Sequence, residues 1–161
     1  MTFDNHGYLV PADTIETDLE TFEKTFVFNE HRNKIFQEYL LFLNAIQDLG
    51  INPFYQWING SFTTMKMNPN DIDVVTFLDY KQHEIFDDAL SNLKYSFRQK
   101  KVDGYFVAIF PEEHPDRSLF TSYVYDFWHN FTRDMKKEVR LKAKFKKGFI
   151  KINFDNKINN Q

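Results

Sequence analysis

Residues 57–75 read WINGSFTTMKMNPNDIDVV. The pair Gly60-Ser61 follows a run that suits a strand, and Asp71 and Asp73 stand at the start of a second apolar run. Alternate side chains of a strand point to the same face, so these two aspartates are expected to lie side by side, about 7 Å apart at their Cα atoms. Burying two carboxylates without a partner costs on the order of several kcal/mol. The pattern therefore predicts cations at this place.

The chemistry expected here is transfer of a phosphorus group. Two carboxylates so placed suit a pair of divalent cations about 4 Å apart. Gly60 allows a sharp turn after its strand, and Ser61 is expected at the start of a short helix, whose N–H groups and hydroxyl suit an anion. The alternative is a solvated strand end, and the neighbouring Gly-Ser turn favours the chemical interpretation.

The stretch resembles the signature of the DNA polymerase β-like nucleotidyltransferase superfamily. Gly60-Ser61 is followed, after nine residues, by Asp71-Ile72-Asp73 in an apolar run, and the resemblance covers roughly residues 30–110. It implies a third carboxylate on a following strand, for which Asp103 matches by strand order. More loosely, GYLVPAD and KGFIKINF make the chain similar, almost end to end, to short bacterial nucleotidyltransferase-like proteins, a likeness that implies no substrate.

The resemblance assigns roles to these residues. Asp71, Asp73 and Asp103 would ligate two Mg²⁺ ions, the cation expected for all-oxygen ligands completed by phosphates. Asp103 would also help to deprotonate an attacking hydroxyl.

The residues between the strands would bind the nucleotide, a nucleoside triphosphate such as ATP. Gly60 and Ser61 would hold the β- and γ-phosphates, and pyrophosphate would leave in line. Lys66 would neutralise triphosphate charge, or is a solvated helix residue. The NMP acceptor would be a protein or RNA hydroxyl.

Composition indicates one domain over residues 1–161, with a core at about 30–110 and a C-terminal helix plus basic strand segment at 117–155. The absence of cysteine excludes disulfides, thiolate metal sites and cysteine nucleophiles. No apolar run approaches the roughly 20 residues of a bilayer crossing, and no secretory signal is visible. We therefore expect a cytoplasmic protein with no membrane partner.

Charge is unevenly distributed although the net charge is only −3. The segment Arg133–Lys151 is strongly basic. It either attracts an RNA acceptor or a nucleotide, or forms a solvated surface, and the sequence favours neither.

Hydrophobic periodicity predicts an α+β (α/β-like) fold, a mixed sheet packed by helices. Expected helices cover 29–49, with Asn29 as N-cap and Gly50 as the stop, 81–97, capped by Asp79, and 117–131. Expected strands cover 54–59, 71–79, 102–110 and 148–154. The first dozen residues are expected to form an irregular arm, after which Asp13 or Thr14 caps a short helix to about Phe28.

Two functions from different classes fit this sequence. The first is a Mg²⁺-dependent nucleotidyltransferase, with a toxin–antitoxin or defence module and a cognate partner protein as its expected setting. The second is a catalytically inactive nucleotidyltransferase-fold antitoxin or interaction subunit. The small size favours the second, because it leaves no separate domain for the base, and the intact aspartates favour the first.

Overall fold

A computed structural model describes residues 1–118, 126–130 and 146–155 and confirms an α+β fold. Its helices are α1 (Leu19–Phe26), α2 (Glu30–Asp48), the 3₁₀ turn η1 (Gly60–Thr63), α3 (Tyr80–Ile85) and α4 (Asp87–Arg98). Its strands are β1 (Thr2–Phe3), β2 (Leu9–Val10), β3 (Thr14–Glu16), β4 (Phe54–Asn59), β5 (Ile72–Asp79), β6 (Val102–Ile109) and β7 (Phe149–Phe154). Residues 117–118 and 126–130 are helical. No helix in these described ranges has both the length and the apolar character needed to cross a bilayer.

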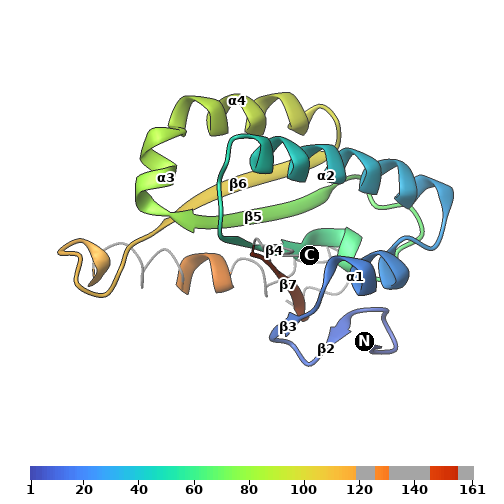
Figure 1. The fold of residues 1–161 in the computed structure, drawn as a ribbon. Helices are drawn as coiled ribbons and strands as arrows, with labels where there is room; N and C mark the ends of the chain where they lie inside the picture. Colours follow the sequence, from blue (N-terminus) through green and yellow to red (C-terminus); the bar gives the residue numbers. More distant parts are fainter. Residues whose placement is uncertain (119–125, 131–145, 156–161) are drawn as a thin grey trace, which may run out of the picture.

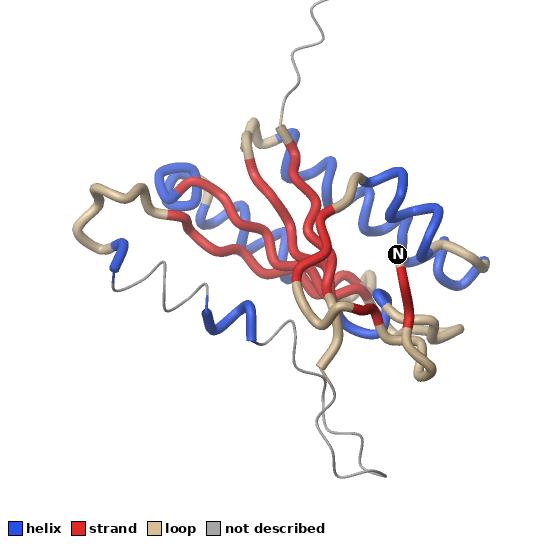
Figure 2. The backbone as a smooth tube through the Cα atoms, turned by 90° about the horizontal axis from the view of Figure 1, so that it is seen from below, coloured by secondary structure: helices blue, strands red, loops and turns tan. Residues whose placement is uncertain are grey.

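The five-stranded sheet is mixed, with the order β3-β7-β4-β5-β6. Strand β4 runs antiparallel to both β5 and β7, whereas β5 and β6 are parallel, as are β3 and β7. Residues 14–16 thus lie beside residues 149–151, which joins the two ends of the chain in one sheet. Figure 2 shows the strands as a twisted central layer.

The two faces of the sheet carry different side chains. Helices α2 and α4 lie over one face (Figure 1), where Ile72, Val74 and Leu78 of β5 join the main core. The opposite face carries a second cluster, which contains Trp57, Val75 and Phe77, with Trp128 of the 126–130 segment packed against it. Because strand residues alternate, Asp73 belongs to this second face.

Local signals explain most element boundaries. The side chain of Asn29 accepts a hydrogen bond from the Arg32 N–H, and Asp79 accepts one from the Lys81 N–H, so both predicted caps are confirmed. Gly50 follows α2 with a φ of 79°, as a helix stop requires.

The N-terminal region differs from its prediction. Strands β1 and β2 pair with each other, so the first dozen residues are not an irregular arm. Thr14 lies in β3, and the cap of α1 is Asp18, whose side chain accepts a hydrogen bond from the Thr21 N–H. Pairing with β7, which is distant in sequence, overrides the local capping signal at residues 13–14.

Two other predictions have different outcomes. The helix predicted at 81–97 is two helices, α3 and α4, which meet at Phe86. Most of the predicted helix 117–131 and most of the basic segment 133–151 lie outside the described residues.

Candidate functional site

Three adjacent strands bring polar residues to one end of the second sheet face. In the strand register Asp73 of β5 is paired with Asn59 of β4 on one side and with Asp103 of β6 on the other. All three stand at a strand end among otherwise apolar neighbours. The structure therefore places two of the three predicted acids on neighbouring strands at one position.

Gly60 faces Asp73 directly. The glycine has a φ of 75°, in the left-handed region, and a Cβ atom there would lie 1.7 Å from Oδ2 of Asp73. Any other residue would therefore displace the carboxylate. The Gly-Ser turn and the second aspartate of the sequence pattern are therefore in contact.

Asp71 is placed differently from its prediction. Strand β5 begins at Ile72, whose N–H donates to the Lys101 carbonyl, so Asp71 precedes the strand. Strand alternation consequently does not place Asp71 beside Asp73. Asp71 nevertheless lines the same cavity as Asp73 and Asp103.

Asp103 is held by two neighbouring side chains, Tyr105 and Arg98. The Tyr105 hydroxyl donates a hydrogen bond of 3.0 Å to Oδ2, and Arg98 Nε lies 3.9 Å from Oδ1. Burial, followed by the hydrogen bond to Asp103, raises the pKa of Tyr105, which keeps this donor protonated. Oδ1 is buried and has no hydrogen-bond partner among the described residues, so it has capacity for another donor or a cation.

A buried arginine fixes the loop that carries the Gly-Ser turn. Arg32 of α2 is fully buried, and its guanidinium donates to the carbonyls of Phe26, Phe62 and Lys66. The guanidinium also lies over the ring of Phe62, 4.5 Å from its centroid. Residues 60–66 are thereby tied to α2, and burial lowers the pKa of Arg32 to about 10, so it stays charged at neutral pH.

Lys147 is a site residue that sequence reasoning missed. Its side chain is buried, and Nζ donates to Asn59 Oδ1 and, at 2.9 Å, to Thr63 Oγ1. Burial lowers its pKa to about 7, and the attraction of the Asp73 carboxylate opposes this shift. In the sequence Lys147 stood among other basic residues, and only the return of the chain as β7 beside β4 brings it to the site.

Most of the residues of this site line one cavity of about 1180 Å³. Its lining contains every residue predicted for the site: Gly60, Ser61, Lys66, Asp71, Asp73 and Asp103. Arg98, Lys147 and residues 4–8 line it as well. The volume slightly exceeds the roughly 300–1,000 Å³ of most ligand pockets, so it has room for a nucleotide and part of an acceptor.

The oxygen atoms in the cavity are suitable ligands for a hard cation such as Mg²⁺, but the described residues do not form a complete metal site. The cavity offers carboxylate oxygens, including the buried Oδ1 of Asp103, and these are the ligands that Mg²⁺ prefers. Within residues 1–118, 126–130 and 146–155, however, no three acidic or histidine side chains converge closely enough to hold a metal ion as they stand. Mg²⁺ in phosphate-binding sites commonly takes only one or two protein carboxylates and completes its shell with waters and substrate phosphates, so the residues present fit it together with a bound nucleotide.

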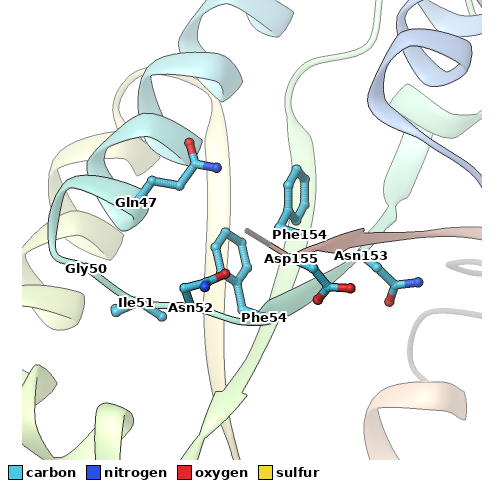
Figure 3. Close-up of a pocket in the computed structure, with 8 residues that line it drawn as sticks. All are labelled: Gln47, Gly50, Ile51, Asn52, Phe54, Asn153, Phe154 and Asp155. Carbon is cyan, nitrogen blue, oxygen red and sulfur yellow. The ribbon is translucent and has the colours of Figure 1, made fainter. Parts of the chain in front are cut away.

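A second cavity, at the other end of β4, does not suit this chemistry. It has a volume of about 190 Å³ and lies between the end of α2 and the last residues of β7 (Figure 3). Asp155 is the one carboxylate in its lining, beside the amides of Gln47, Asn52 and Asn153. The cavity is smaller than typical ligand pockets, and we assign no nucleotide to it.

Comparison with known proteins identifies the family. The chain belongs to DUF6932, a family of unknown function, whose model matches residues 1–153. No match is found among curated proteins or among solved structures. The match spans strands β1 to β6, most of β7 and every residue that lines the larger cavity.

Proposed function

We propose that this protein is a Mg²⁺-dependent nucleotidyltransferase that moves an NMP from a nucleoside triphosphate, ATP foremost, onto a protein or RNA hydroxyl. One observation carries the proposal. Asp73 and Asp103 are paired on adjacent parallel strands, and Asp73 contacts the Gly60 turn at the edge of a cavity of about 1180 Å³. Together with the resemblance in sequence, this arrangement supports a phosphate-binding turn beside metal-binding carboxylates.

The proposal assigns the cation to Asp71, Asp73 and Asp103. When bound, Mg²⁺ supplies positive charge that stabilises the transferring phosphoryl group. Gly60 and Ser61 hold the β- and γ-phosphates, while Lys66 and Lys147 add positive charge to the lining of the same cavity.

Asp103 receives the proton of the acceptor. Its carboxylate takes the proton from the acceptor hydroxyl, and the hydroxyl oxygen forms a bond to the α-phosphorus. The bond between that phosphorus and the pyrophosphate oxygen breaks in line. Tyr105 and Arg98 orient the Asp103 carboxylate for this transfer.

The alternative proposal is an inactive nucleotidyltransferase-fold antitoxin or interaction subunit. It is favoured by the lack of a preformed three-acid group in the described ranges. The attraction between Lys147 and Asp73 favours it too, since a lysine in its charged form offsets a carboxylate without any metal.

Labelling separates the two functions. Purified protein is incubated with each radiolabelled NTP, Mg²⁺ and cell extract, and the labelled macromolecule is identified by protease and ribonuclease treatment. The enzyme proposal predicts label on one class of acceptor, lost with EDTA and in Asp73→Ala. Label that survives Asp73→Ala refutes the mechanism, and no label with any nucleotide favours the interaction subunit.

A further inference from the structure

The proposed site leaves the base of the nucleotide without a partner, and the N-terminal turn is in the right place to supply one. Residues 4–8 line the same cavity as Gly60, Asp73 and Asp103. They come from the segment between β1 and β2, far in sequence from the acids. The inference below rests on the proposed function and names a further part of that site.

Hydrogen bonds to and from Asp4 stabilise the turn at residues 4–8. Its Oδ1 accepts hydrogen bonds of 2.9 Å from the N–H groups of His6 and Tyr8. The Asp4 N–H donates to the Tyr8 carbonyl, and the Gly7 N–H donates to the Asp4 carbonyl. The backbone hydrogen bond from Tyr8 holds the pKa of Asp4 below its usual value, so the carboxylate keeps accepting these hydrogen bonds at neutral pH.

The turn is also fastened to the loop that carries the Gly-Ser pair. The Met65 N–H donates to the Gly7 carbonyl at 2.9 Å, and Tyr8 forms a β-bridge with Thr64. Gly7 has a φ of 77°, and a Cβ atom there would lie 2.8 Å from Cβ of Met65. The two segments are therefore in close backbone contact, which sets the distance between the turn and the phosphate-binding residues.

The side chains of the turn have the chemistry of a base-binding surface. The rings of His6 and Tyr8 lie 6.0 Å apart at their centroids and are inclined by 30°. His6 is exposed and Tyr8 half-buried, and both line the cavity. Aromatic faces stack with any base, and the Asn5 amide carries both donors and an acceptor for a base edge.

We propose that Asn5, His6 and Tyr8 form the nucleobase subsite of this cavity, with the base stacked on the His6 ring. Asp4 and Gly7 are positioning residues, because their hydrogen bonds shape the turn that carries the subsite.

Calorimetric titration tests this assignment, with two Mg²⁺-saturated probes. The first is the NTP that binds best of the four, and the second is inorganic tripolyphosphate, which has no base. We expect His6→Ala to weaken NTP binding by about 5- to 150-fold, the range of one base–aromatic stack. Tripolyphosphate affinity should stay within about twofold, and His6→Phe should bind NTP almost as well as the wild type. Tyr95→Ala, on α4 and 70% exposed, is the surface control and should change neither affinity.

The outcomes separate this inference from the proposed function. If the wild type binds neither probe, the nucleotide site itself is wrong, and the subsite fails with it. If both probes bind and His6→Ala leaves the NTP affinity unchanged, the subsite is wrong and the nucleotidyltransferase proposal stands. Equal weakening of both probes, or loss of NTP binding in His6→Phe, also overturns the stacking role.

Discussion

Oδ2 of Asp73 occupies the space that a side chain at position 60 would need: a Cβ atom on Gly60 would lie 1.7 Å from it. The two residues come from β5 and from the turn after β4, and the strand register brings them together through the pair Asn59 and Asp73. The glycine of the sequence pattern thus serves two purposes, a left-handed turn and an open space for a carboxylate.

This contact predicts the effect of Gly60→Ala on stability. The substitution combines left-handed strain, roughly 1–2 kcal/mol, with displacement of Asp73. Gly50→Ala is the matched control, because Gly50 has a φ of 79° and nothing within 4 Å of an added Cβ. We expect Gly60→Ala to lower the free energy of unfolding in urea by about 1–3 kcal/mol more than Gly50→Ala does.

A double-substitution cycle checks the cause. In an Asp73→Ala background the displaced carboxylate is gone, so the extra cost of Gly60→Ala should largely disappear. An extra cost that persists in that background, or equal losses for both glycines in the parent protein, would show that the contact does not matter.

Lys147 should make stability depend on pH. Its folded pKa of about 7 lies below its ordinary value of 10.5, because burial disfavours the charged form. Between these two values the unfolded chain binds a proton that the folded protein releases, so stability rises with pH, by at most about 1.4 kcal/mol per unit. Urea unfolding of the wild type and Lys147→Met from pH 7 to 9 measures the difference in slope. Parallel slopes would mean that Lys147 keeps its ordinary pKa.

Arg32 should be needed to hold the loop at residues 60–66. Arg32→Met leaves the carbonyls of Phe26, Phe62 and Lys66 without their guanidinium donors, and each buried carbonyl left unpaired costs about 1–3 kcal/mol. We expect a loss of at least about 3 kcal/mol in the free energy of unfolding. Lys34→Met, on the same helix with a 74% exposed side chain, should stay within about 0.5 kcal/mol. A loss below about 1 kcal/mol in Arg32→Met would contradict the role.

Local patterns predicted the elements whose signals lie within one segment. The cap at Asn29, the periodicity of α2 and the apolar run 54–59 need no distant partner, and the structure has helix and strand at those places. The proximity of Asp73 and Asp103 followed from strand order alone, because parallel neighbours in register bring equivalent positions together.

The remaining features depend on contacts between distant segments. Strand β3 forms because it pairs with β7, more than a hundred residues later in the chain. The local sequence at residues 13–14 instead predicted a helix cap. Lys147 belongs to no sequence motif. Its place in the site follows only from the hydrogen bonds that its Nζ donates to Asn59 and Thr63 in the folded chain. The position of the turn at residues 4–8 could not be predicted from local sequence either, because its contacts with Thr64 and Met65 fix it.

The central claim is that Asp73 and Asp103 bind a Mg²⁺–nucleoside triphosphate, and thermal unfolding with and without these ligands tests it most directly. A ligand at 100 times its Kd adds about 2.7 kcal/mol, which corresponds to a rise in Tm of roughly 5–10 °C for a chain of this size. We expect that rise with Mg²⁺ and at least one NTP, its loss with EDTA and in Asp73→Asn, and its retention in Asp79→Asn at the far end of the same strand. No rise with any nucleotide, or an equal rise in Asp73→Asn, would contradict the account.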